Sequence, residues 1–126
     1  MDISKEYIQM CEKAIEIQKL WRMDIRHDYF VWKKNYEIPE CPSCCYTEHR
    51  QYRLDTFIWL PRQDQLQALL ELDKRPAYAL DSVVNHLLNS HDIKPYWKQF
   101  TSMEQLWLAF VIEKNYKKIW NGEDWV

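Results

Sequence analysis

An uninterrupted apolar run near the end of the chain, Leu106–Ile112, constrains the fold more than any other feature. An apolar residue at every position suits a helix that is covered on several sides rather than one that lies on a surface. Ser102 stands where an N-cap would, and Gln105 follows three residues later to complete a capping box. Gly122, the only glycine, is placed to follow the last turn. Thr101–Val126 is therefore predicted to hold a central helix around which the other elements pack.

The overall composition predicts one globular domain over residues 1–126. A chain of 126 residues can bury a core without metal or disulfide support. Seven tryptophans and eight tyrosines indicate a core rich in aromatic side chains. A net charge of -2 gives no general attraction to nucleic acid or to an anionic membrane. No apolar run is long enough to span a bilayer, and the first residues lack the pattern of a secretion signal, so we expect a cytoplasmic protein.

Three further helices are predicted before the central one. Ser4 can cap the first helix, which should end near residues 22–24. Pro61 suits the first turn of a second helix, and Pro76 suits the start of a third. Three- and four-residue spacing predicts the buried faces of these helices. The expected core positions are Tyr7, Ile8, Cys11, Ala14, Ile15, Gln18 and Trp21 in the first helix, Leu66, Leu69 and Leu70 in the second, and Ala77, Leu80, Val83, Val84, Leu87 and Leu88 in the third.

Two segments are predicted to be strands. His27–Trp32 is short, aromatic and β-branched, and Gln51–Leu60 alternates before an apolar end. Together they would form a two-stranded antiparallel ribbon, which is marginally stable alone and must lie against helices. The predicted fold class is thus α+β and predominantly helical, with about four helices, a small ribbon and a central C-terminal helix.

A loop rich in cysteine and proline is the sharpest candidate for a metal site. Cys41, Cys44 and His49 reproduce the first three ligands of a zinc-knuckle pattern, and thiolate and imidazole are suitable ligands for tetrahedral zinc. The knuckle would place its fourth ligand at position 54, which is Leu54. Candidates for the fourth ligand are Cys45, His27 and Cys11. The competing interpretation is that all four cysteines are reduced, free thiols, as is usual in the cytosol.

Linear catalytic motifs are missing from the sequence. A single glycine excludes a glycine-rich phosphate loop, and the four histidines share no motif with a nucleophile or a metal-binding helix. Glu104 and Glu113 are about two and a half turns apart on one predicted helix, so they do not share a face closely. The sequence therefore favours a non-enzymatic protein, although catalytic groups can also converge from distant positions.

Arginines and aromatic residues interleave between residues 50 and 62, as they do where single-stranded nucleic acid binds. Asp55 and Asp64 dilute the positive charge, and aromatic strand residues more often face a core. We therefore hold a nucleic-acid-binding or zinc-dependent module centred on Cys41–Arg53 as the alternative function. The residues in question are Arg50, Arg53 and Arg62 with Tyr52, Phe57 and Trp59.

The preferred functional hypothesis is contact with another protein. Trp120 and Trp125 follow the central helix, and they either fold back as a hydrophobic lid or stay exposed as a protein-binding patch. Arg62 and Gln63 open the second helix with polar side chains. These four residues are the predicted partner-binding residues. The sequence identifies neither the partner nor the oligomeric state, and a homodimer is one of the possible states.

Two segments of the chain resemble a known group of sequences. Trp59–Leu70 (WLPRQDQLQALL) and Ser102–Val126 (SMEQLWLAFVIEKNYKKIWNGEDWV) are similar to stretches of small uncharacterised proteins encoded by bacteriophages and prophages. The resemblance implies a phage or prophage origin and a place in the bacterial host cytoplasm. It implies no mechanism and no catalytic residue, so the expected function is that of an accessory protein acting through protein contacts.

Overall fold

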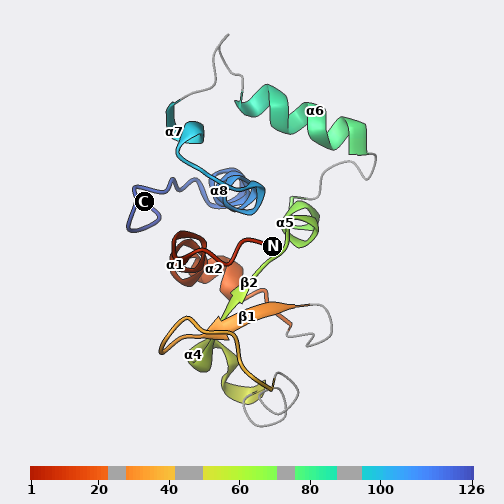
Figure 1. Ribbon diagram of the computed structural model, residues 1–126. Coiled ribbons are helices and arrows are strands. Elements are labelled where there is room, and N and C mark those ends of the chain that lie inside the picture. The colour runs from red at the N-terminus through yellow and green to blue at the C-terminus, as the bar shows by residue number, and fades with distance from the viewer. Residues whose placement is uncertain (23–27, 42–49, 71–75, 88–94) are drawn as a thin grey trace.

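The computed structural model describes residues 1–22, 28–41, 50–70, 76–87 and 95–126, with the backbone alone at residues 50 and 76–80. It shows a small α+β fold in which one two-stranded antiparallel sheet lies toward one end of the molecule, with helices on both sides of it (Figure 1). The elements are α1 (Lys5–Lys13), α2 (Ile15–Gln18), β1 (Tyr29–Trp32), the 3-10 turn η1 (Arg50–Tyr52), α4 (Arg53–Thr56), β2 (Phe57–Leu60), α5 (Gln63–Ala68), α6 (Pro76–Leu87), α7 (Pro95–Lys98) and α8 (Met103–Tyr116). The fold class agrees with the prediction, whereas the helices are shorter and more numerous than the four expected.

Helix α8 lies at the centre of the helical part, where Figure 1 shows it nearly end-on. Its residues from Trp107 to Ile112 are all buried, as the apolar run predicted. The Ser102 hydroxyl accepts the Gln105 backbone N–H at 3.1 Å, which confirms the predicted N-cap. The Gln105 side chain, however, accepts from the Thr101 N–H rather than from that of Ser102. At the other end, Lys117 adopts the left-handed conformation and terminates the helix, so the role predicted for glycine is wrong.

The first predicted helix is broken at Ala14 into α1 and α2. Ala14 has ψ 66°, which interrupts the helical backbone and changes the direction in which the next residues point. Ile15 is consequently 58% exposed, although uninterrupted helical spacing predicted it to be buried. Ile17 is fully buried in its place. The break therefore moves the apolar face, and it also turns Gln18 toward β2.

The two strands pair in the predicted antiparallel arrangement, with Tyr29 opposite Leu60 and Trp32 opposite Phe57. The second strand is only four residues long, because Gln51–Thr56 folds into η1 and α4 instead of extending it. Arg53 explains part of this difference: its Nε donates to the Trp21 carbonyl at 3.0 Å, which ties α4 to the end of the first helical segment. This long-range contact overrides the local alternation that predicted a longer strand.

The sheet has one strongly aromatic face. Trp21 stacks on Trp59 with ring centroids 6.4 Å apart and an interplanar angle of 3°, and Phe30 meets Phe57 edge-on at 5.0 Å. Side chains alternate along a strand, so Tyr29 and Leu60 share the opposite face. That opposite face carries the candidate site described below.

Helix α6 begins at Pro76, as predicted. Val83 is buried, but Val84 is exposed, so the predicted apolar stripe is narrower than expected. His86 connects the helix to α8: its Nε2 lies 3.4 Å from Glu113 Oε2, and its ring meets Phe110 edge-on at 4.9 Å. No helix in the described part of the chain is long and apolar enough to cross a membrane.

Candidate protein-binding site

An apolar cavity of about 210 Å³ opens beside β1. Four segments that are distant in the sequence build it: the residues before α1, the start of β1, the end of β2 and the chain that returns after β1. This volume lies below the ~300–1,000 Å³ of typical small-molecule sites, and it suits one or two side chains better than a cofactor. The residues that line the cavity are Ile3, Asp28, Tyr29, Phe30, Ile38, Pro39 and Leu60.

The rim of the cavity is apolar and open to solvent. Ile3 and Ile38 are each 56% exposed, and Tyr29 is 45% exposed. Leu60 lies at the bottom and is almost fully buried. Large apolar side chains that are exposed singly are ordinary, but three around one cavity form an apolar patch of the kind found at interaction sites.

A tight turn after β1 positions the outer wall of the cavity. The Trp32 N–H donates to the Glu37 carbonyl and the Tyr36 N–H donates to the Trp32 carbonyl, each at 2.8 Å. Tyr36 takes the left-handed conformation, with φ 62°, that closes this turn without a glycine. Its hydroxyl donates to Glu12 Oε2, which holds the strained residue against α1. The chain then passes Ile38 and Pro39 at the cavity.

Asp28 supplies the charged group of the cavity lining. Its carboxylate accepts from Trp21 Nε1 at 2.8 Å and from Gln65 Nε2 at 2.7 Å. Gln65 in turn accepts the Arg62 N–H at 2.9 Å, which is half of the capping arrangement of α5. Hydrogen bonds therefore connect the cavity to the start of α5. This region contains two of the predicted partner-binding residues, Arg62 and Gln63.

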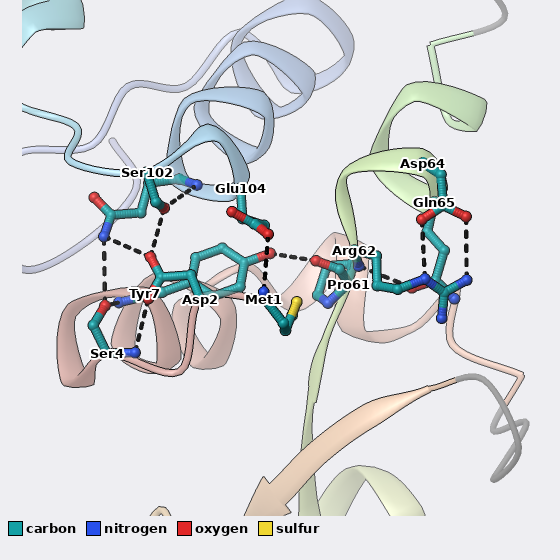
Figure 2. A network of polar contacts seen from close by, with 11 residues as sticks. Met1, Asp2, Ser4, Tyr7, Pro61, Arg62, Asp64, Gln65, Ser102 and Glu104 are labelled. Atoms are coloured by element: carbon teal, nitrogen blue, oxygen red, sulfur yellow. Dashed lines mark hydrogen bonds and ion pairs between the residues drawn. The ribbon is translucent and has the colours of Figure 1, made fainter.

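Arg62 and Gln63 lie at this corner, directly after the buried end of β2. Figure 2 shows the Arg62 guanidinium paired with Asp64, through Nε and Nη2 at 3.0 and 3.1 Å. The hydrogen bonds to Asp64 raise the pKa of Arg62, and the neighbouring Asp28 and Tyr29 add smaller contributions in the same direction. The same pair lowers the pKa of the Asp64 carboxyl. Arg62 is thus linked through Gln65 to Asp28 in the cavity lining, although neither Arg62 nor Gln63 lines the cavity itself.

The two predicted tryptophans lie elsewhere and are buried. Trp120 and Trp125 are each 8% exposed and pack against each other with ring centroids 5.0 Å apart. Trp125 Nε1 donates to the Met10 carbonyl at 3.0 Å, so the tail closes over α1. Of the two alternatives for this tail, the burial fits the lid and gives the indole rings no open surface.

Most of the predicted zinc site, Cys44, Cys45 and His49, lies outside the described residues. Cys41 is exposed and is disulfide-bonded. The prediction that all four cysteines are free thiols is therefore wrong at Cys41. A disulfide sulfur is not a thiolate, so a zinc site that used Cys41 would require reduction first. Within the described ranges, no three His, Cys, Asp or Glu residues cluster around a possible metal position.

The arginine and aromatic set divides between the core and the surface. Phe57 and Trp59 are buried in the sheet, whereas Tyr52 is exposed on η1. Arg53 is held by its bond to Trp21 O, and Arg62 by Asp64. The described side chains of this set, which do not include that of Arg50, do not form one surface on which successive bases could stack.

The remaining titratable groups do not assemble into a catalytic arrangement in the described part of the chain. Cys11 is fully buried beside Tyr7, and burial raises the pKa of its thiol, which makes it an inert core residue. Tyr7 donates from its hydroxyl to the Pro61 carbonyl at 2.6 Å, as Figure 2 shows. Burial raises the pKa of this phenol too. Both groups therefore connect α1 to the core rather than serve chemistry.

No family model, curated protein or solved structure matches this chain. The geometry of the described residues therefore carries the functional argument. The sequence reasoning singled out Arg62 and Gln63, neither of which lines the cavity, and it missed Ile3, Tyr29 and Ile38. A signal was present, since Ile3 and Ile38 both lie outside the predicted helices and strands, where large apolar side chains need a reason.

Proposed function

We propose that this chain is a non-enzymatic interaction protein that binds an apolar side chain of a protein partner in the cavity beside β1. The observation that carries this proposal is the ring of exposed Ile3, Tyr29 and Ile38 around a cavity of about 210 Å³. An apolar anchor in a pocket with a polar border is the usual arrangement of an interaction hot spot. Arg62, which is linked to the lining residue Asp28 through Gln65, and the adjacent Gln63 would supply such a border.

The resemblance to phage and prophage sequences supports an accessory role in a bacterial host, with the partner a protein in the same cell. The resemblance concerns Trp59–Leu70, which includes the Arg62 corner of the cavity. A zinc-dependent or nucleic-acid-binding module at Cys41–Arg53 remains the alternative, and metal content is treated among the predictions below.

The experiment that tests the proposal is photo-crosslinking from the cavity rim in host cells. A photoreactive phenylalanine replaces Tyr29, and the crosslinked partner is identified by mass spectrometry and then purified for a direct binding measurement. Ile38→Glu places a charge on the apolar rim and is expected to weaken binding at least about tenfold, equivalent to ~1.4 kcal/mol.

Ile15→Glu is the matched control, since Ile15 is equally exposed but lies on α2 and does not line the cavity. It should bind the partner as the wild type does. The double variant Arg62→Ala, Gln63→Ala should give a smaller loss than Ile38→Glu, because polar rim residues contribute less than an apolar anchor. Equal binding by Ile38→Glu and Ile15→Glu would overturn the proposal.

A further inference from the structure

The outer edge of β1 has a free backbone position at Phe30. The Gln18 amide occupies the outer edge of β2: its Nε2 donates to the Trp59 carbonyl and its Oε1 accepts the Trp59 N–H, both at 2.9 Å. The Trp59 backbone groups therefore point away from β1. In an antiparallel pair, both residues of such a non-hydrogen-bonded pair point outward, so the N–H and C=O of Phe30 also face away from the sheet.

Trp32, two residues further along, shows the same orientation. Its outward N–H and C=O are bonded to Glu37 and Tyr36 of the returning chain. That chain would reach Phe30 at position 39, where it has Pro39, which has no N–H to donate. The outward groups of Phe30 have no hydrogen bond within the described residues. The sheet thus has the beginning of a third strand that stops one position short of Phe30.

We infer that the partner adds an extended segment to the edge of β1 at Phe30 and places one apolar side chain in the adjacent cavity. This inference rests on the proposed function and specifies the form of its ligand. Strand addition combines main-chain hydrogen bonds with a pocket for a side chain, and both lie here side by side. The guest side chain would occupy the cavity that Ile38 and Pro39 line next to Phe30.

The charges around the cavity favour a basic guest. Asp28 lines the cavity, and Glu37 and Glu40 are the exposed neighbours of its outer wall. The nearby cations are engaged elsewhere: Lys33 donates to the Leu54 carbonyl at 3.3 Å, Lys34 lies 4.9 Å from the centre of the Trp32 ring, and Arg62 is paired with Asp64. Lysine or arginine residues on either side of the apolar anchor would therefore meet carboxylates.

A second copy of this chain fits the edge less well than a peptide. If two β1 strands paired at Phe30 in antiparallel fashion, residue 28 of one copy would lie opposite Trp32 of the other. Trp32 has already used its outward N–H and C=O within its own chain. Self-pairing would thus be limited to a single position, whereas the backbone groups of an extended peptide are not already bonded within a sheet.

The test uses the full-length protein and the fluorescein-labelled probe Lys-Val-Lys-Leu-Lys-Val-Lys, blocked at both ends. Binding is measured by fluorescence anisotropy, and amide hydrogen exchange by NMR reports on the protein. The Phe30 amide should exchange more slowly when the peptide is bound, while that of Val31, which faces Ile58 inside the sheet, should not change. Methylating the peptide nitrogen that pairs with Phe30 should weaken binding about two- to tenfold, whereas methylating the next nitrogen, which points away from the sheet, should not.

The outcomes separate this inference from the proposed function. Suppose that the peptide binds the wild type but not Ile38→Glu, and that the exchange rate of the Phe30 amide stays unchanged. This result would overturn strand addition and would still support the cavity as a binding site. Absence of peptide binding would overturn strand addition, while partner capture from the rim would be judged on its own result. A Phe30 amide already as slow as that of Val31 in the free protein, or one that slows with protein concentration alone, would also overturn the inference.

Discussion

Replacing Gln18 with alanine should destabilise the protein through the edge of β2. The Gln18 side chain makes two hydrogen bonds of 2.9 Å to the backbone of Trp59, a residue that is almost fully buried. Each such bond contributes roughly 0.5–1.5 kcal/mol net, so losing both should cost about 1–3 kcal/mol. The value should fall in the upper half of this range, because the Trp59 N–H and C=O would be left buried without partners.

Urea denaturation, followed by tryptophan fluorescence, measures this loss as a lower midpoint with an unchanged slope. Gln67→Ala is the matched control, because it also removes a glutamine side chain. The Gln67 side chain lies on α5 and makes no hydrogen bond within the described residues. Exchange of the Trp59 amide should accelerate in Gln18→Ala alone. If Gln18→Ala and Gln67→Ala unfold at the same urea concentration, the amide does not stabilise the strand edge and the reasoning is refuted.

Three other measurements test further parts of the structure. Burial opposes the ionisation of Asp2, but hydrogen bonds from Ser102, Ser4 and Gln105 lower its pKa below 3.8 (Figure 2). The Asp2 carboxylate therefore stabilises the fold above that pH, and this contribution is lost as the pH falls. Asp2→Asn should flatten the acid side of the curve of unfolding free energy against pH, and an unchanged curve would contradict this. The hydrogen bond to Glu12 raises the pKa of Tyr36 to about 12, and Glu12→Ala should return it toward 10.0 in an ultraviolet titration that Tyr36→Phe identifies. If zinc binds at Cys41, Cys44, Cys45 and His49, reduced protein purified without a metal-affinity tag should contain nearly one equivalent of zinc. Cys41→Ser should abolish this zinc binding. Reduced wild-type protein without zinc would refute the hypothesis.

Local sequence signals predicted the parts of the fold that depend on local chemistry. The Ser102 cap and the apolar run predicted α8, and β-branched and aromatic residues predicted that two segments pair. Long-range contacts decided the rest: Arg53 reaches Trp21 and favours helix where Gln51–Thr56 alternates like a strand. The break at Ala14 has no glycine or proline to announce it, so helical spacing was extended through it and misplaced Ile15.

The candidate site was harder to predict because no single element builds it. Ile3, Tyr29, Ile38 and Leu60 come from four segments, and their proximity follows from the register of the sheet and the turn after β1. Hydrophobic periodicity describes one helix or strand at a time, so it cannot show a cavity between segments. Arg62 was identified from its position at a helix start, and the structure alone connects it to the cavity through Gln65 and Asp28.

The contrast between the two sheet edges is the strongest argument that the β1 edge binds something. A ribbon of two strands has two edges, and each unpaired edge is a potential site of aggregation. The protein closes the β2 edge with a side-chain amide that satisfies both Trp59 backbone groups, and it closes the β1 edge at Trp32 with its own returning chain. Only Phe30, among the described outward positions of the ladder, keeps open backbone groups, and it is the position that faces the apolar cavity. Because Trp59 and Trp32 are protected among the described edge positions, the open groups of Phe30 next to exposed isoleucines support the proposed recognition site.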